Sequence, residues 1–179
     1  MILLVNICNE KLHYYEFVRP IEDILKENNM KFFVRDYLKV NKRDLKKADK
    51  IIICGTSLKD SLFLNNFEKF KWLGDFKKSV LGICGGMQII GLIFCKKEIR
   101  KKTEVGFFKE NFNKDFLGLK GSQEVYHLHN YWVHFNKEFI IYNSGKIPQA
   151  VKHIKKNIYG VLFHPEVRQK GLILNFCKG

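Results

Sequence analysis

The stretch Gly82-Ile83-Cys84-Gly85-Gly86-Met87-Gln88 decides the fold, because it joins an apolar strand pattern to an apolar helix pattern. The run at 79–81 predicts a buried strand, and the run at 87–94 predicts a helix. A cysteine at such a junction, with glycine two residues before and two after, is typical of a nucleophile elbow. The glycines let neighbouring chain pass without a clashing Cβ. The N-terminus of the following helix favours a negatively charged sulfur.

A second pattern lies near the C-terminus, where an apolar strand pattern at 159–163 ends in His164. Glu166 follows two residues later, and residues two apart in an extended chain face the same side. Glu166 can therefore orient His164, and His164 can take the proton of Cys84. The sequence predicts a catalytic triad of Cys84, His164 and Glu166, acting as nucleophile, base and orienting carboxylate.

Together the two patterns resemble the class I glutamine amidotransferases of the triad type. The family's elbow pattern, G-x-C-x-G-x-Q, is met at 82–88, and its second signature, F-H-P-E, is met at 163–166. The resemblance covers essentially the whole chain and implies an α/β fold, a flavodoxin-like three-layer sandwich with a mainly parallel central sheet. It also implies acyl transfer from L-glutamine through a thioester on Cys84, with no metal and no organic cofactor.

An oxyanion forms during such chemistry and needs donated N–H groups. We expect one from the backbone of Gly85, directly after the nucleophile, and a second from Gly55, which follows the apolar run 51–54. Related amidotransferases usually carry Gly-Gly-Pro-x-Ser at this place, where this chain has Gly55-Thr56-Ser57. An ordinary turn at a strand end also accounts for Gly55.

The resemblance implies further substrate-binding residues. Gln88 would hold the bound glutamine, although a solvated position on the helix also suits it. The segment at 128–133 matches the family segment whose backbone grips the amino and carboxylate groups of the substrate, and it contains His129, Asn130 and Tyr131.

The other strands and helices are predicted from the spacing of apolar residues. Strands and helices alternate at first, which implies a parallel sheet with helices on both faces and a site at the carboxyl ends of the strands. The expected strands are 2–7, 31–37, 50–54 and 80–84, then the shorter 106–109, 125–128, 132–135, 139–142, 149–154 and 158–163. The expected helices are 18–28, 61–73, the elbow helix to residue 95, and 169–177.

Length and composition limit the class of protein. The 179 residues suit one domain spanning 1–179, and no apolar run approaches the ~20 residues of a membrane helix. Five cysteines without C-x-x-C spacing, together with a predicted thiol nucleophile, indicate a reducing cytoplasm. No cysteine or carboxylate pattern completes a metal site with His127 and His129, so we expect none, and we expect His127 and His134 at the surface.

The formal net charge is +14, but lysine and arginine are spread along the chain without a nucleic-acid-binding motif. This distribution favours a solvated basic surface over nucleic-acid binding, and a docking patch for an acidic partner stays open.

The chain has no P-loop and no G-x-G-x-x-G, so the resemblance implies that ammonia passes to an ATP-dependent synthase subunit. Val167 after F-H-P-E is most similar to the glutaminase subunits of two-subunit GMP synthases, whereas anthranilate- and aminodeoxychorismate-type members usually have serine there. Three alternatives stay open: an amidotransferase subunit of another pathway, a free-standing γ-glutamyl amide or peptide hydrolase, and a non-catalytic binding module.

Overall fold

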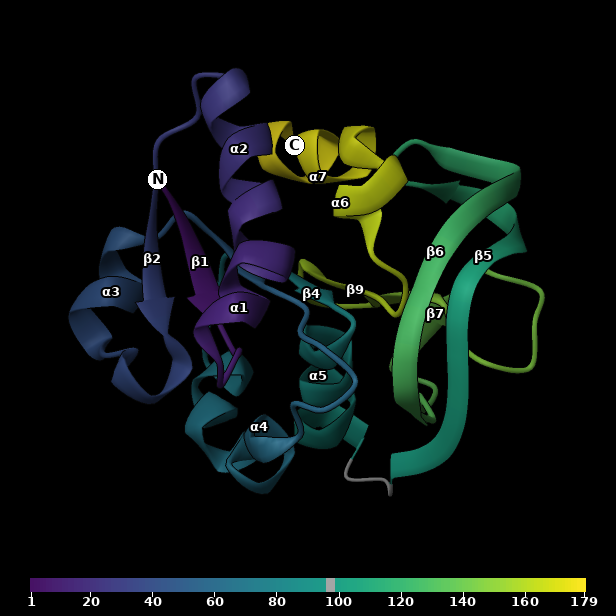
Figure 1. Ribbon diagram of the computed structural model, residues 1–179, viewed down its shortest axis with the longest axis horizontal. Coiled ribbons are helices and arrows are strands. Elements are labelled where there is room, and N and C mark those ends of the chain that lie inside the picture. The colour runs from purple at the N-terminus through teal and green to yellow at the C-terminus, as the bar shows by residue number, and fades with distance from the viewer. Residues whose placement is uncertain (96–98) are drawn as a thin grey trace.

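A seven-stranded sheet forms the centre of the computed structural model, which describes residues 1–95 and 99–179 (Figure 1). Its strand order is β2-β1-β3-β4-β9-β8-β7; the first five of these strands are parallel, and β8 and β7 are antiparallel. The bounds are β1 Ile2–Asn6, β2 Phe32–Asp36, β3 Lys50–Ile53, β4 Ser79–Ile83, β7 Phe139–Ile141, β8 Ala150–His153 and β9 Ile158–Val161. The parallel part has the order of flavodoxin-like folds.

Two hydrophobic clusters cover the two faces of this sheet, because successive side chains of a strand point to opposite faces. In β1, Leu4 belongs to one cluster while Leu3 and Val5 belong to the other. The first cluster includes α2 (Arg19–Glu27) and α7 (Lys170–Lys178), and the second includes α5 (Gly85–Cys95). The predicted three-layer α/β fold is confirmed.

Several shorter helical segments complete the layers. They are α1 (Lys11–His13), the π-helical turn η1 (Tyr14–Val18), the 3₁₀ turn η2 (Tyr37–Lys39), α3 (Lys42–Lys47), α4 (Leu62–Asn65), the 3₁₀ segment η3 (Phe67–Gly74) and α6 (Pro165–Arg168). The single helix expected at 61–73 is wrong. Asn66 ends α4, since its side-chain amide donates to the Leu62 carbonyl, and the chain continues as η3.

A long hairpin of β5 (Ile99–Phe116) and β6 (Leu119–Val133) forms a separate two-stranded sheet that curves along one side of the molecule (Figure 1). Leu117 and Gly118 both have positive φ, 51° and 90°, as a two-residue hairpin turn requires. The short strands expected at 106–109, 125–128 and 132–135 are therefore parts of two long ones, and β6 ends at Val133. Mostly exposed polar residues hide the length of β5 from an apolar pattern.

The helices are short relative to a lipid bilayer. Among residues 1–95 and 99–179, no helix is both long and apolar enough to cross one.

Candidate active site

Cys84 occupies the turn between β4 and α5 and has a φ of 48°, a left-handed conformation that non-glycine residues rarely adopt. The backbone around it is crowded. A Cβ on Gly82 would lie 2.5 Å from the carbonyl carbon of Gly86, and a Cβ on Gly86 would lie 2.5 Å from the Ile53 carbonyl oxygen. Only glycine fits at either place, so the sequence G-x-C-x-G is required by the geometry of the turn.

His164 lies just after β9, beside the elbow. The Cys84 N–H donates to the Val161 carbonyl at 2.7 Å, which continues the pairing of β4 with β9. The His164 N–H donates to the Tyr126 carbonyl of β6 at 2.9 Å. The imidazole is thus held between the central sheet and the hairpin, at the carboxyl end of β9.

The His164 ring is tightly enclosed. Its Nδ1 lies 2.7 Å from Oε1 of Glu166, and both side chains are almost fully buried. Phe17 of η1 packs with its ring centroid 5.2 Å from that of the imidazole. A Cβ on Gly55 would lie 2.5 Å from Cε1 of His164 and 3.4 Å from the Cβ of Cys84, so Gly55 adjoins both residues.

Burial alone would lower the pKa of His164, because it disfavours the charged ring. The negative charge of Glu166, followed by that of Cys84, outweighs burial and raises the pKa well above its ordinary value. The pair therefore favours an imidazolium facing the sulfur. Such an arrangement can donate a proton to a leaving group and later accept one from water.

The thiol of Cys84 is buried and points at strand β6. Its Sγ lies 3.5 Å from the carbonyl oxygen of Leu128. The Nε2 atom of His164 makes no well-aligned hydrogen bond among the described residues, although contact with Cys84 contributes to the raised pKa of the ring. In this state the thiol is directed to the hairpin, and Nε2 remains available to a reacting group.

A small pocket, part of it open to solvent, begins at Cys84. Gln88 is buried rather than solvated, and its Nε2 donates to the Tyr131 carbonyl at 2.8 Å. The Asn130 amide donates to the Leu58 carbonyl at 3.0 Å, which ties β6 to the opposite wall. The pocket is lined by Thr56, Ser57, Leu58, Asp60, Phe63, Leu64, Cys84, Gly85, Gln88, Leu128, His129, Asn130 and Tyr131. Gly55 is not in the lining and lies against His164.

The loop after β3 is held by a network that sequence reasoning missed. Oδ2 of Asp60 accepts a hydrogen bond from Thr56 Oγ1 at 2.6 Å and lies 2.7 Å from His13 Nδ1. It also accepts from the Asn9 N–H at 3.1 Å. The only sequence signal for this network was an acidic residue, Asp60, four positions after Thr56. This buried carboxylate fixes the loop that replaces Gly-Gly-Pro.

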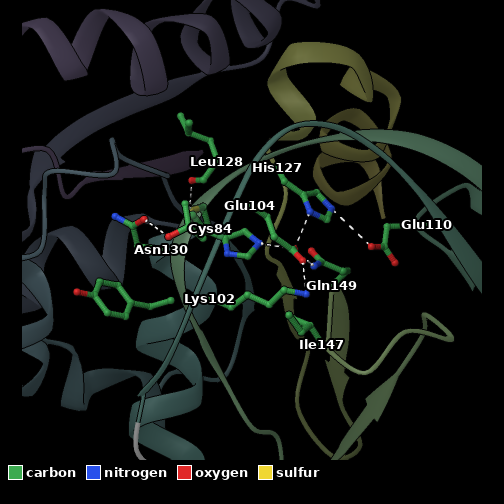
Figure 2. A network of polar contacts seen from close by, with 12 residues as sticks. Cys84, Lys102, Glu104, Glu110, His127, Leu128, Asn130, Ile147 and Gln149 are labelled. Atoms are coloured by element: carbon green, nitrogen blue, oxygen red, sulfur yellow. Dashed lines mark hydrogen bonds and ion pairs between the residues drawn. The ribbon is translucent and has the colours of Figure 1, made fainter.

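A second cluster of ionisable side chains lies behind β6, and Figure 2 shows Glu104 meeting His127, Lys102 and Gln149 there. Oε2 of Glu104 is 3.0 Å from His127 Nδ1 and 3.2 Å from His129 Nε2. The expected surface position of His127 is wrong, because the residue is only 1% exposed. Glu104 was missed because its link to His129 is the cross-strand register of the hairpin.

Burial lowers the pKa of both histidines, to about 4 for His129. Burial would raise the pKa of Glu104, but the hydrogen bond from Lys102 and the two histidines lower it. The cluster therefore combines a carboxylate with two neutral imidazoles. One ligand atom from each residue falls within 4.8 Å of the others, so a carboxylate does complete a potential metal site here, contrary to the sequence expectation.

Two known proteins are similar to this chain in sequence. Imidazole glycerol phosphate synthase subunit HisH 2 of Campylobacter jejuni is 29% identical over 160 residues, covering 76% of this chain and 82% of that protein. A glutamine-hydrolysing GMP synthase subunit of Methanosphaera stadtmanae is 39% identical over 98 residues, covering 50% of this chain and 52% of that protein.

The fold is shared with a solved structure, a putative GMP synthase subunit from Thermoplasma acidophilum. The TM-score is 0.84 at 21% identity, over 99% of this chain and 92% of that one. The model of the family "Glutamine amidotransferase class-I" matches residues 12–172. This chain belongs to the class-I glutamine amidotransferases, a family of glutamine-hydrolysing enzymes.

Proposed function

We propose that this chain is a glutaminase subunit, which hydrolyses L-glutamine to glutamate and ammonia through Cys84, His164 and Glu166. One observation supports this most. A buried imidazole lies between the carboxylate of Glu166 and the sulfur of Cys84, and a small pocket opens at that sulfur. This arrangement supports the roles of nucleophile for Cys84, base for His164 and orienting group for Glu166.

In the proposed first step, the proton of the Cys84 thiol passes to His164, the sulfur attacks the side-chain amide carbon, and the carbonyl electrons move onto oxygen. The N–H groups of Gly85 and Gly55 would stabilise this oxyanion. Gly85 is the first residue of α5, where backbone N–H groups lack partners within the helix. Collapse of the intermediate breaks the C–N bond, and His164 gives its proton to the departing ammonia.

The glutamyl thioester is then hydrolysed. Neutral His164 takes a proton from water, the hydroxide adds to the thioester carbon, and the Cys84 thiolate leaves with the C–S electron pair. Glu166 would keep Nδ1 of the ring protonated throughout, so that Nε2 faces the reaction.

The rest of the pocket would hold the substrate. We assign this to Gln88 and to the β6 residues His129, Asn130 and Tyr131, all of which line the pocket. The hydrogen bond from Gln88 to the Tyr131 carbonyl would keep β6 in register with α5. The side chain of His129 meets Glu104 behind the strand, so the backbone of this residue is the group offered to glutamine.

Two kinds of synthase are candidates for the ammonia. We favour the ATP-dependent subunit of a GMP synthase, a role in purine biosynthesis, because the 39% identical relative is a glutamine-hydrolysing GMP synthase subunit. The similarity to imidazole glycerol phosphate synthase subunit HisH 2 is weaker in identity but covers more of this chain, so that enzyme's other subunit is the second candidate.

The test is ammonia release from glutamine, with wild type and Cys84→Ala side by side. Each is assayed alone, with an ATP-dependent GMP synthase subunit, and with the synthase subunit of imidazole glycerol phosphate synthase. Release that needs Cys84 and rises only with the first subunit is the expected result. A rise only with the second would assign the other pathway. Release indifferent to both would favour a free-standing hydrolase, and release unaffected by Cys84→Ala would contradict the chemistry itself.

A further inference from the structure

Glu104 of β5 lies close to His127 and His129 of β6, and Figure 2 shows the contact between Glu104 and His127. We propose that these three residues form a binding site for one divalent transition-metal ion of the zinc class. The proposal does not depend on the glutaminase function, since none of its arguments uses the reaction.

The hairpin register brings the three side chains to one face. Glu104 is directly opposite His129, and residues two apart on a strand share a face, so His127 joins them. A shift in register between Lys101 and Glu104 aims the carboxylate at the histidines. Gly106 stands opposite His127, and a Cβ added to it would meet nothing within 4 Å, so no side chain from that position fills the face.

The distances suit a tetrahedral metal. With metal–ligand bonds of about 2.0–2.2 Å, two ligands of a tetrahedral ion stand about 3.3–3.5 Å apart. Oε2 of Glu104 is 3.0 Å from His127 Nδ1 and 3.2 Å from His129 Nε2, so small shifts would seat an ion between them. Two imidazoles and one carboxylate also occur together at zinc sites that keep a fourth position for water.

The poorly hydrogen-bonded ring nitrogens of His129 support a bound metal ion at this place. His129 is only 2% exposed, and neither of its ring nitrogens makes a well-aligned hydrogen bond among the described residues, although the Lys102 backbone is close enough to affect the pKa of the ring. The contact from its Nε2 to Glu104 is close but lacks hydrogen-bond alignment. A buried polar atom without a partner costs about 1–3 kcal/mol, and a metal bound at Nε2 would remove that cost.

The surroundings supply a second layer of contacts. Lys102 Nζ lies 2.9 Å from Oε1 of Glu104, which leaves Oε2 for the ion. Gln149 Nε2 lies 3.4 Å from the same Oε2, and Glu110 Oε1 lies 3.7 Å from His127 Nε2. Contacts of this kind orient metal ligands and hold carboxylates in place.

The donor set limits the metal. Imidazole nitrogen suits zinc, cobalt and nickel, whereas magnesium and calcium take oxygen ligands. The probes are therefore Co²⁺, whose visible absorption reports tetrahedral coordination, and Zn²⁺ as its competitor. Mg²⁺ serves as the negative control.

The experiment uses the full chain carrying Cys84→Ser, untagged and stripped with a chelator, so that the reactive thiol takes no part. Co²⁺ is titrated into this parent and into parents that also carry Glu104→Gln or His129→Gln. The matched control is His134→Gln, because His134 is an exposed histidine on the same segment of chain. Thermal unfolding with and without Zn²⁺ checks that each variant folds.

We expect one Co²⁺ per chain with tetrahedral absorption, displaced by Zn²⁺ and unaffected by Mg²⁺. Glu104→Gln and His129→Gln should each weaken binding at least about a hundredfold, and His134→Gln should leave it unchanged. Zn²⁺ should raise the unfolding temperature of the parent and of His134→Gln only. Absence of a tetrahedral spectrum in the folded parent overturns the proposal, as does binding that both Glu104→Gln and His129→Gln retain when folded.

Discussion

Two buried histidine–carboxylate groups lie near strand β6, and the pKa values of their imidazoles shift in opposite directions. Glu166 pairs with His164, and the pKa of that histidine rises. Glu104 is shared by two histidines and is already neutralised by Lys102, and there the pKa of both histidines falls. Burial opposes the imidazolium in both places. At His164 the charges of Glu166 and Cys84 outweigh burial, whereas at His127 and His129 burial outweighs the charge of Glu104, which Lys102 also contacts.

Replacing one histidine from each group should give the largest difference in glutamine hydrolysis. His164→Gln removes the base that faces Cys84, and we expect glutamine hydrolysis to fall by at least about ten-thousand-fold. His127→Gln should cost no more than about tenfold, because His127 contacts Glu104 and not the sulfur. Steady-state ammonia release measures both. Equal losses of glutamine hydrolysis in the two folded variants would show that the two histidine groups do not differ in their role.

Neutralising the carboxylates is the matched test, with a smaller expected effect. Glu166→Gln should reduce kcat by about a hundredfold to ten-thousand-fold, because the ring loses its orienting charge but keeps its place. Glu104→Gln should reduce it by about tenfold or less. Measuring kcat and KM for both variants tests this expectation. A larger loss of kcat in Glu104→Gln than in Glu166→Gln would contradict the roles proposed for the two carboxylates.

Crowding of the His164 ring gives a third effect. In Gly55→Ala the new Cβ would lie 2.5 Å from Cε1 of His164, so the ring must move. A displacement near 1 Å costs about a hundredfold in rate, and overpacking costs about 1–3 kcal/mol of stability. Gly171→Ala is the control, since nothing lies within 4 Å of its added Cβ. Normal activity in Gly55→Ala would show that the ring is not held from this side.

The smallest expected effect is on the pH dependence of stability. Because the folded pKa of His164 is raised, its stabilisation is complete below the unfolded value near 6.5 and is lost as pH rises through the folded pKa. Above pH 6.5 this group should lower the unfolding free energy by at most about 1.4 kcal/mol per pH unit. Glu166→Gln should flatten that slope in denaturant titrations from pH 6 to 9. An unchanged slope would mean that Glu166 does not set the charge of His164.

The parallel part of the fold could be predicted because its signals are local. Continuous apolar runs such as 51–54 identify buried parallel strands without knowledge of their neighbours. Cys84 and His164 each follow such a run, and the structure brings both to the same end of the sheet.

The hairpin and its cluster could not be predicted in the same way. Glu104 and His129 meet through the register of two long strands, and β5 is largely polar and exposed. Asp60 likewise reaches His13 across 47 positions of sequence. In each case the contact depends on how separate segments pair, and a one-residue slip would send the side chains to the other face.

The contact between the Cys84 thiol and the Leu128 carbonyl has a practical consequence. That carbonyl belongs to the backbone, so no side-chain substitution removes it, and the contact changes only when the thiol or the backbone of β6 moves. The rate at which a small alkylating reagent modifies Cys84 would therefore report the position of the hairpin. The labelling rate of Cys84 would then measure movement of this strand caused by a substrate, a partner or an ion.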